Sequence, residues 1–484
     1  MKTNSLLSII SVAFTVILAA CDGGGGGSTP TTTAKVGFSK GVITAKGSIT
    51  VNGVKFNSGS ADVKFDNLSG AGIDDSKLKV GMVVKIKGKI DDASKTGIAE
   101  KIEFTDNFQG PIDSVNLVTG TFTVFGQTVL IDANTVFEGS SGLTGLTPLV
   151  VGNVVEVSGF PDAAGVILAT RIENKTNSGE SFEVKGTISN ITGNTFILTP
   201  PGSGTALTVT MAVGATLPVG VDNGSFVEVR VTGSGTIVTA TKVELESELE
   251  AEDNDRLEVE GIVTSVDTPN ATFVVNGIAV NAAGMTLPAV GQKIEVEGQL
   301  VNGVLVPASS SSIKVEQECN IEIKANVTAV NGNSLTTLGS LTGFVTADTI
   351  FKDDSSAQLV NFSLTDIKVG DHLEITAFAN PDPANPDTGI ISKIERKNPS
   401  SEIALKGPIN FSTPSAGTFI LLGLTIDTNG AGVQFKSNIV TITSTAFYAA
   451  LTPDKTIVKA KGTAFDTAAK TLTATEVEIK KQLP

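Results

Sequence analysis

One short phrase recurs along this chain and constrains its fold more than any other feature. It reads VGMVVKIKG at 80–88, VGNVVEVSG at 151–159, VGQKIEVEG at 290–298 and, without the last glycine, VGDHLEITA at 369–377. Apolar and polar residues alternate within it, which is the period of a half-buried β-strand. A strand phrase that returns at long, similar intervals indicates a tandem array of one small β unit.

The segments around the phrase show the same order of elements in each unit. A unit opens with a strand that carries a glycine near its middle, as in FEVKGTI at 182–188 and LEVEGIV at 257–263. A hairpin follows, as in TFVVNGIAV at 272–280, where Asn-Gly favours a type I′ turn. A looser stretch comes next, with a short helical turn expected within 359–369. The phrase strand and a last strand then complete the unit, and the predicted last strands are 98–104, 168–173, 240–245, 390–394 and 474–479.

This order repeats about six times, which sets the predicted architecture. The third and sixth units keep the phrase strand but lose its Val-Gly pair. Five strands in about 65 to 80 residues, each with one apolar face, must close on themselves or pack face to face. We therefore predict an all-β chain, a tandem array of about six small five-stranded OB-like β-barrels, with a two-sheet sandwich as the alternative. The opening glycine of each unit would mark a sharp bend where a Cβ is crowded. These positions are Gly41, Gly110, Gly186, Gly261, Ala325 in a degenerate fifth unit, and Gly407.

The strand pattern and the composition together predict the domain boundaries. They divide the chain into a signal peptide (1–20), a tether (21–34), three repeats (35–106, 107–178 and 179–247), an acidic linker (248–256) and three more repeats (257–317, 318–398 and 399–484).

The N-terminus has the pattern of an export signal. Lys2 precedes a mostly apolar stretch at 6–18, which is shorter than the roughly 20 residues of a membrane span. The sequence LAAC at 18–21 resembles the lipobox of bacterial lipoproteins, a resemblance that implies acylation of Cys21 and removal of the preceding signal. The alternative is an ordinary secretory signal with a chance cysteine. The Gly-, Ser- and Thr-rich segment 22–33 is then a tether. We expect the anchor in the cell envelope, with the outer membrane or cell surface ahead of the inner membrane.

Composition excludes several classes of function. The formal net charge of −15 disfavours nucleic-acid binding, because acidic proteins repel phosphate backbones. With Cys21 acylated, Cys319 has no partner for a disulfide within the monomer. We interpret it as a half-buried thiol at the start of a strand, with a reactive thiol or an intermolecular disulfide as the alternatives. The single histidine, His372, excludes histidine relays and multi-histidine metal sites, and it is interpreted as a strand residue. The absence of Trp, with 23 Phe and one Tyr, disfavours sugar stacking.

Two regions hold candidate binding residues. An acidic run separates the third and fourth units: Glu244, Glu246, Glu248, Glu250, Glu252, Asp253 and Asp255. We interpret it as a strand face followed by a self-repelling spacer, with loose Ca²⁺ binding as the alternative. The second region is the Pro-rich loop at 380–389, where Asp382, Asn385 and Asp387 are candidate metal ligands. Turn chemistry alone also accounts for these residue types. No cofactor is predicted.

The pattern Val-Gly-x-x-Val-Glu-Val-x-Gly, after a Gly-x-Ile strand and a Val-Asn-Gly hairpin, resembles a bacterial family of small β domains. These domains occur in tandem in exported lipoproteins and have no assigned function. The resemblance covers roughly 36–480 and implies a fold but no activity. No nucleophile elbow, phosphate loop or metalloprotease motif appears. We expect a non-catalytic spacer or protein-interaction array that is held at a membrane by its lipid and has an envelope or surface protein as partner. The alternative is a module that binds a small ligand, Ca²⁺ or an oligosaccharide on one or more barrels.

Overall fold

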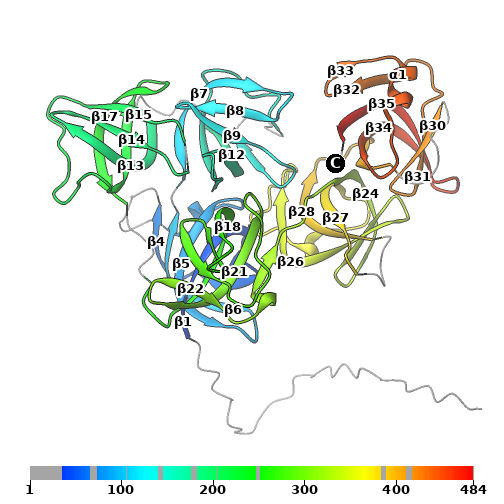
Figure 1. The fold of residues 1–484 in the computed structure, drawn as a ribbon. Helices are drawn as coiled ribbons and strands as arrows, with labels where there is room; N and C mark the ends of the chain where they lie inside the picture. The colour runs from blue at the N-terminus through cyan, green and yellow to red at the C-terminus, as the bar shows by residue number, and fades with distance from the viewer. Residues whose placement is uncertain are drawn as a thin grey trace, which may run out of the picture. The chain divides into compact units, whose positions relative to one another are not determined.

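The computed structural model describes residues 35–65, 74–104, 106–139, 145–175, 182–202, 204–246, 251–382, 388–409 and 417–482 (Figure 1). These residues are mostly β-strand and form six small closed barrels in tandem, named barrel 1 to barrel 6 in chain order. The predicted all-β, OB-like architecture is confirmed, and the sandwich alternative is not adopted.

The first three barrels occupy the N-terminal half of the described residues. Barrel 1 contains β1 (Lys35–Ala45), β2 (Ile49–Val51), β3 (Val54–Asn57), β4 (Asp62–Phe65), the 3₁₀ turn η1 (Asp75–Lys77), β5 (Val83–Asp91) and β6 (Thr96–Phe104). Barrel 2 contains β7 (Phe108–Asn116), β8 (Thr121–Val124), β9 (Gln127–Leu130), β10 (Val136–Gly139), β11 (Val154–Pro161) and β12 (Ile167–Lys175). Barrel 3 contains β13 (Phe182–Thr192), β14 (Thr195–Thr199), β15 (Leu207–Met211), β16 (Phe226–Thr232) and β17 (Ile237–Leu245).

The other three barrels follow the same order with local additions. Barrel 4 contains β18 (Arg256–Asp267), β19 (Thr272–Val275), β20 (Ile278–Asn281), β21 (Lys293–Val301), β22 (Val304–Pro307), η2 (Ser310–Ser312) and β23 (Ile313–Val315). Barrel 5 contains β24 (Ile321–Asn331), β25 (Ser334–Thr337), β26 (Leu341–Asp353), η3 (Leu364–Asp366), β27 (His372–Ala379) and β28 (Gly389–Lys397). Barrel 6 contains β29 (Ile403–Pro408), β30 (Thr418–Leu421), β31 (Leu424–Asp427), β32 (Gln434–Ser437), β33 (Val440–Thr441), the helix α1 (Ser444–Ala450), β34 (Thr456–Asp466) and β35 (Thr471–Gln482).

Each barrel closes in the same way. In barrel 1, β1 pairs antiparallel with β2 and with β5, β3 forms a hairpin with β2 and runs parallel to β6, and β6 pairs antiparallel with β5. This circular order of five strands is a small Greek-key barrel without open edges. In barrel 6, the described part of the chain closes the barrel between β29 and β30 by a bridge between Ile409 and Leu421. The short helical turn predicted within 359–369 is present as η3.

The first glycine of the recurring phrase forms a turn that ties the phrase strand to the opening strand. Gly81 has φ +88°, and its N–H donates to the carbonyl of Ile43 at 2.9 Å. A glycine adopts this conformation at little cost, because it has no Cβ. The third and sixth units, which lack the Val-Gly pair, retain the turn: Gly224 (φ +99°) donates to Ile188, and Asp454 (φ +58°) donates to Ile409. The equivalent turns of barrels 2, 4 and 5 are made by Gly152, Gly291 and Gly370.

The last glycine of the phrase lies where the two final strands of a barrel press together. The register of β11 against β12 shifts after Ser158, and a Cβ on Gly159 would lie 2.3 Å from the carbonyl oxygen of Leu168. The opening glycine is also crowded, as predicted. A Cβ on Gly110 would lie 2.3 Å from the ring of Phe125, the first residue of the hairpin turn. The repeated glycines are therefore explained by the fold.

The barrels join in pairs through their opening strands, and this pairing does not follow chain order throughout. β1 runs parallel to β18, which joins barrel 1 to barrel 4. β7 pairs antiparallel with β13 and β24 with β29, which joins barrel 2 to barrel 3 and barrel 5 to barrel 6. The described strands thus form three continuous sheets of two barrels each.

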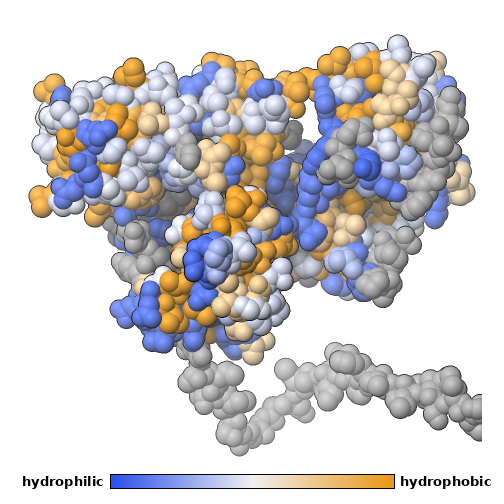
Figure 2. All heavy atoms as spheres, viewed as in Figure 1, coloured by the Kyte–Doolittle hydropathy of each residue, from blue (hydrophilic) through white to orange (hydrophobic). Residues whose placement is uncertain are grey.

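The apolar residues lie mainly in the cores of the barrels. The buried apolar side chains of barrels 1, 4, 5 and 6 form four clusters, and Phe38 of barrel 1 belongs to the cluster of barrel 4. Those of barrels 2 and 3 form one cluster. Figure 2 shows hydrophilic and hydrophobic residues interspersed over the visible face of the chain. Fully exposed valines include Val213 and Val219 in barrel 3.

Candidate functional site

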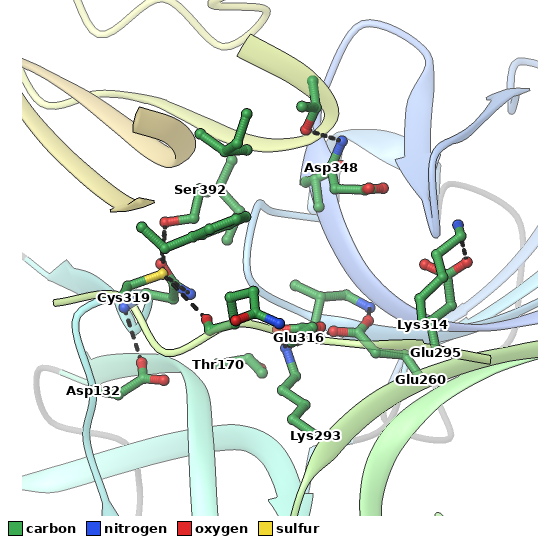
Figure 3. Close-up of a pocket in the computed structure, with 18 of the residues that line it drawn as sticks. Asp132, Thr170, Glu260, Lys293, Glu295, Lys314, Glu316, Cys319, Asp348 and Ser392 are labelled. Atoms are coloured by element: carbon green, nitrogen blue, oxygen red, sulfur yellow. Dashed lines mark hydrogen bonds and ion pairs between the residues drawn. The ribbon is translucent and has the colours of Figure 1, made fainter. Parts of the chain in front are cut away.

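A cavity of about 300 Å³ is lined by residues of barrels 1, 2, 4 and 5 and of the segment that leads into barrel 5 (Figure 3). On one side of it, as Figure 3 shows, lie Glu260, Lys293, Glu295 and Lys314 of barrel 4. On the opposite side lie Asp132 of barrel 2, Cys319 just before β24, and Ser392 of β28. A small apolar contact of Val42, Phe160 and Ile262 joins barrels 1, 2 and 4 beside it.

Strand geometry brings the charged side chains of barrel 4 together. Glu260 precedes the opening glycine on β18, and Ile294 and Lys293 at the start of β21 lie opposite Gly261 and Ile262. Glu295 is two residues further along β21, so it points to the same side as Lys293. Lys314 on β23 lies opposite Glu295 in the antiparallel pair.

A lysine held between two carboxylates forms the centre of this group. Lys293 Nζ lies 2.6 Å from Glu260 Oε1 and 3.0 Å from Glu316 Oε1. Burial alone would lower the pKa of Lys293, but Glu260 and Glu316 raise it well above its usual range, so this lysine stays charged. Glu260 Oε2 also accepts the backbone N–H of Val42 at 2.7 Å, a contact that crosses from barrel 4 to barrel 1.

Two carboxyl groups that line the cavity have pKa values near neutral pH. Burial raises the pKa of Glu316 to about 7, although Lys293 opposes the shift. Burial and the neighbouring Glu258 raise the pKa of Glu295 to about 8, against the opposing effect of Lys314, whose Nζ lies 2.5 Å from Glu295 Oε1. These carboxyls therefore change charge in the physiological range of pH.

A second polar group links barrel 2 to barrel 5 on the opposite side of the cavity. The Cys319 thiol donates to Ser392 Oγ at 3.2 Å, and the Ser392 hydroxyl donates to Asn134 Oδ1 at 2.8 Å. Asn134 Nδ2 in turn lies 3.5 Å from Cys319 Sγ. Burial raises the pKa of the Cys319 thiol, which keeps it protonated. Cys319 is a free, half-buried cysteine just before β24.

Most of the residues singled out from the sequence lie elsewhere. Cys21, Asn385 and Asp387 are outside the described residues. Asp382 is exposed, its backbone N–H donates to Asn380 Oδ1 at 3.0 Å as in a turn, and it does not line the cavity.

The acidic run is divided among different surroundings. Glu246 follows β17, and its carboxylate lies 4.0 Å from Lys85 Nζ of barrel 1. Asp255 Oδ2 accepts the N–H of Glu252 at 2.8 Å, and Asp253 Oδ1 accepts the N–H of Gly303 at 3.2 Å. Glu248 and Glu250 lie outside the described residues. Glu244 lies 2.7 Å from Lys242 Nζ on the same strand. The described carboxylates thus have separate partners and do not converge on a common point.

His372 begins the strand β27, which agrees with its interpretation as a strand residue. The side chain is almost fully buried, and Nδ1 lies 2.7 Å from Asn326 Oδ1 on the neighbouring strand. Burial lowers its pKa, so the imidazole is neutral at pH 7. This histidine is not among the residues that line the cavity.

Sequence reasoning missed the cavity because its walls come from barrels far apart in the chain. One signal was present in the phrase itself. Lys293 occupies the position that holds Val83 and Val154 in the first two units, and a charged residue there departs from the pattern. No pattern in one chain specifies which barrels meet around that lysine.

Within the described ranges, no group of three or more His, Cys, Asp or Glu side chains is placed to hold a metal ion. Among the helices that the structure describes, none has the length and apolar character needed to cross a membrane.

Parts of the chain are similar to a known protein family. Four segments of the chain match the family described as Domain of unknown function (DUF5666): residues 40–103, 109–173, 260–307 and 324–384. They fall on barrels 1, 2, 4 and 5, whose residues line the cavity. The matches support a tandem array of this uncharacterised domain. None of the curated proteins compared with the chain matches it.

Proposed function

We propose that this protein is a lipid-anchored protein of the bacterial cell envelope and that its barrels form a non-catalytic array for interaction with another envelope or surface protein. The main support for the proposal is that the repeated residues have a structural role in the barrels. In all six barrels the turn before the phrase strand donates an N–H to the opening strand, and in barrels 1, 2, 4 and 5 the donor is the first glycine of the phrase, so this repeated residue has a structural role.

The joining of the barrels also supports an array that acts as a unit. The opening strands pair by main-chain hydrogen bonds from barrel 1 to 4, from 2 to 3 and from 5 to 6. Main-chain hydrogen bonds between strands contribute to association, which a flexible linker alone does not supply. Loops on joined barrels can then contact one partner together.

The sequence at 18–21 is the basis for the proposed anchor, and replacement of its cysteine tests it. We expect Cys21→Ser to abolish incorporation of labelled palmitate and to move the protein from the membrane fraction to the soluble fraction, because acyl chains supply the membrane affinity. Cys319→Ser is the matched control and should leave labelling and membrane attachment unchanged. A Cys21→Ser protein that is still acylated and membrane-bound would refute the anchor.

Protease treatment of intact cells tests the location and the partner surface. A C-terminal epitope that is cleaved on whole cells would place the array at the surface, and one that is protected until the outer membrane is opened would place it in the periplasm. A photo-crosslinker at Val213 or Val219, both fully exposed in barrel 3, should then give adducts of discrete mass in cells. The same crosslinker at buried Val229 should give none. Equal patterns at exposed and buried positions would argue against a specific partner.

A further inference from the structure

We propose that the cavity lined by barrels 1, 2, 4 and 5 binds a small organic cation, a primary ammonium group carried on an apolar body. This site would be additional to the anchored interaction array and does not depend on it. The cavity volume of about 300 Å³ is at the lower end of the range for small-molecule sites.

The charge of the lining selects for a cation. Five carboxyl groups line the cavity, against two lysines. Both lysines are already paired, Lys293 with Glu260 and Glu316 and Lys314 with Glu295, at 2.5 to 3.0 Å. An anion would meet this excess of carboxylates, whereas an ammonium group would offset it. The five carboxyl groups belong to Asp132, Glu260, Glu295, Glu316 and Asp348.

One hydrogen-bond acceptor among the lining residues has no donor within the described part of the chain. Asn52, in the hairpin turn of barrel 1, lines the cavity and is only 5% exposed. Its Nδ2 donates to Ser39 Oγ at 3.0 Å, but its Oδ1 has no hydrogen-bond partner among the described residues. Buried polar atoms are nearly always paired in native proteins, so a lone acceptor here indicates a missing donor. An ammonium group carries three N–H donors and no acceptor.

Apart from the charged groups and a few neutral polar side chains, such as Thr170 and Ser392, the lining is apolar, and this apolar part defines the body of the ligand. Val42, Leu168, Ile350, Phe378 and Ile390 line the cavity from barrels 1, 2 and 5. A site with an apolar wall and a few convergent polar groups has the usual composition of a ligand site. A short alkyl or aryl group would pack on this wall while its ammonium contacts the carboxylates of barrel 4.

The protonation of the carboxyls gives the proposed site a pH signature. Glu316 faces Lys293 and Glu260, and Glu295 faces Lys314, Glu258 and Asp348. Burial raises the pKa of both glutamates above the ordinary range. A bound ammonium would stabilise their charged forms, so binding should release protons and become tighter as the pH rises from 6 to 8.

Calorimetric titration of the full-length protein in detergent tests the proposal with three matched probes: phenethylammonium, phenethyl alcohol and 3-phenylpropanoate. We expect saturable binding of the ammonium probe only. Glu316→Gln and Glu295→Gln should each weaken that binding about ten-fold. Glu476→Gln, which removes a carboxylate paired with two lysines in barrel 6, should leave it unchanged.

A second variant tests the cavity without changing any of its charged residues. Val315 is partly exposed at the cavity, so Val315→Trp should occupy the space, retain the thermal transition of the parent and abolish binding. The proposal is overturned if the ammonium probe fails to bind at millimolar concentration, if the alcohol binds equally well, or if binding survives Val315→Trp. None of these outcomes affects the lipid anchor, which palmitate labelling tests separately.

Discussion

At the scale of single residues, the recurring phrase is explained by contacts of its glycines. Gly159 packs so closely against Leu168 that a Cβ would lie 2.3 Å from the carbonyl oxygen. We therefore expect Gly159→Ala to destabilise barrel 2 by about 1–3 kcal/mol, the usual cost of overpacking. Urea unfolding followed by circular dichroism, with hydrogen exchange of β11 and β12, would measure this loss.

Gly145 is the matched control, because a Cβ there meets no atom within 4 Å and its φ is not positive. Gly145→Ala should be neutral or slightly stabilising. Equal losses for the two variants would show that the glycines act through chain flexibility and not through crowding.

Sequence reasoning succeeded where one residue type has one physical cause. Asn276-Gly277 predicted a type I′ hairpin, and the structure has φ +48° and +80° at these positions. The turns of some other units were not predicted, because their first residue is not asparagine. Phe125 and Leu422 occupy the position equivalent to Asn276 and adopt φ +51° and +52°. Tertiary packing imposes those conformations, so local propensity does not reveal them.

At the scale of elements, the junction of barrel 2 with barrel 3 contains a buried group of charges that predicts a pH dependence. Lys185 Nζ lies 3.1 Å from Asp106 Oδ1 and 3.4 Å from Glu228 Oε2, beside the pairing of β7 with β13. Burial raises the pKa of Asp106 to about 6, against the opposing effect of Lys185. Burial raises the pKa of Glu156 and Glu183 in the same direction.

A raised pKa means that the folded junction binds the Asp106 proton more tightly than the unfolded chain does. The stability of the junction should therefore fall as the pH rises from about 4 to about 6. Hydrogen exchange in β7 and β13, corrected for intrinsic rates, would measure this slope. Asp106→Asn should reduce it, whereas Asp222→Asn, at an exposed turn of barrel 3, should leave it unchanged. The assignment would be contradicted if the stability of the junction rose with pH, or if Asp106→Asn left its pH dependence unchanged.

Pairing between barrels could not be predicted from the sequence. The strand β1 carries nothing that specifies β18, more than 200 residues away, as its parallel neighbour. Their register places Gly37 opposite Arg256 and Lys40 opposite Val259. The contacts that select it, such as Lys40 Nζ to Asn276 Oδ1 at 3.0 Å, involve residue types common on any exposed strand. For the same reason the cavity was not predicted, although Lys293 is a charged residue at a phrase position that is valine in the first two units.

At the scale of the whole molecule, this pairing predicts that distant segments unfold together. Arg256 at the start of β18 contacts Asp92 of barrel 1 at 2.6 Å, and Glu258 and Glu297 of barrel 4 at 3.3 and 2.9 Å. Glu258 is fully buried, so Arg256→Met would leave it without its main counter-charge. We expect a loss of about 3–5 kcal/mol, the usual cost of breaking a buried ion pair from one side.

Because Arg256 bridges the two barrels, the loss should appear in both. Hydrogen-exchange protection should fall in β1 as well as β18, and it should be unchanged in β34 and β35 of barrel 6. Arg230→Met is the matched control: Arg230 pairs with Glu183 within barrel 3 at 2.7 Å and is partly exposed, so its effect should be small and confined to that barrel. If protection falls in β18 alone, barrels 1 and 4 unfold independently, and the main-chain pairing of β1 with β18 does not couple them.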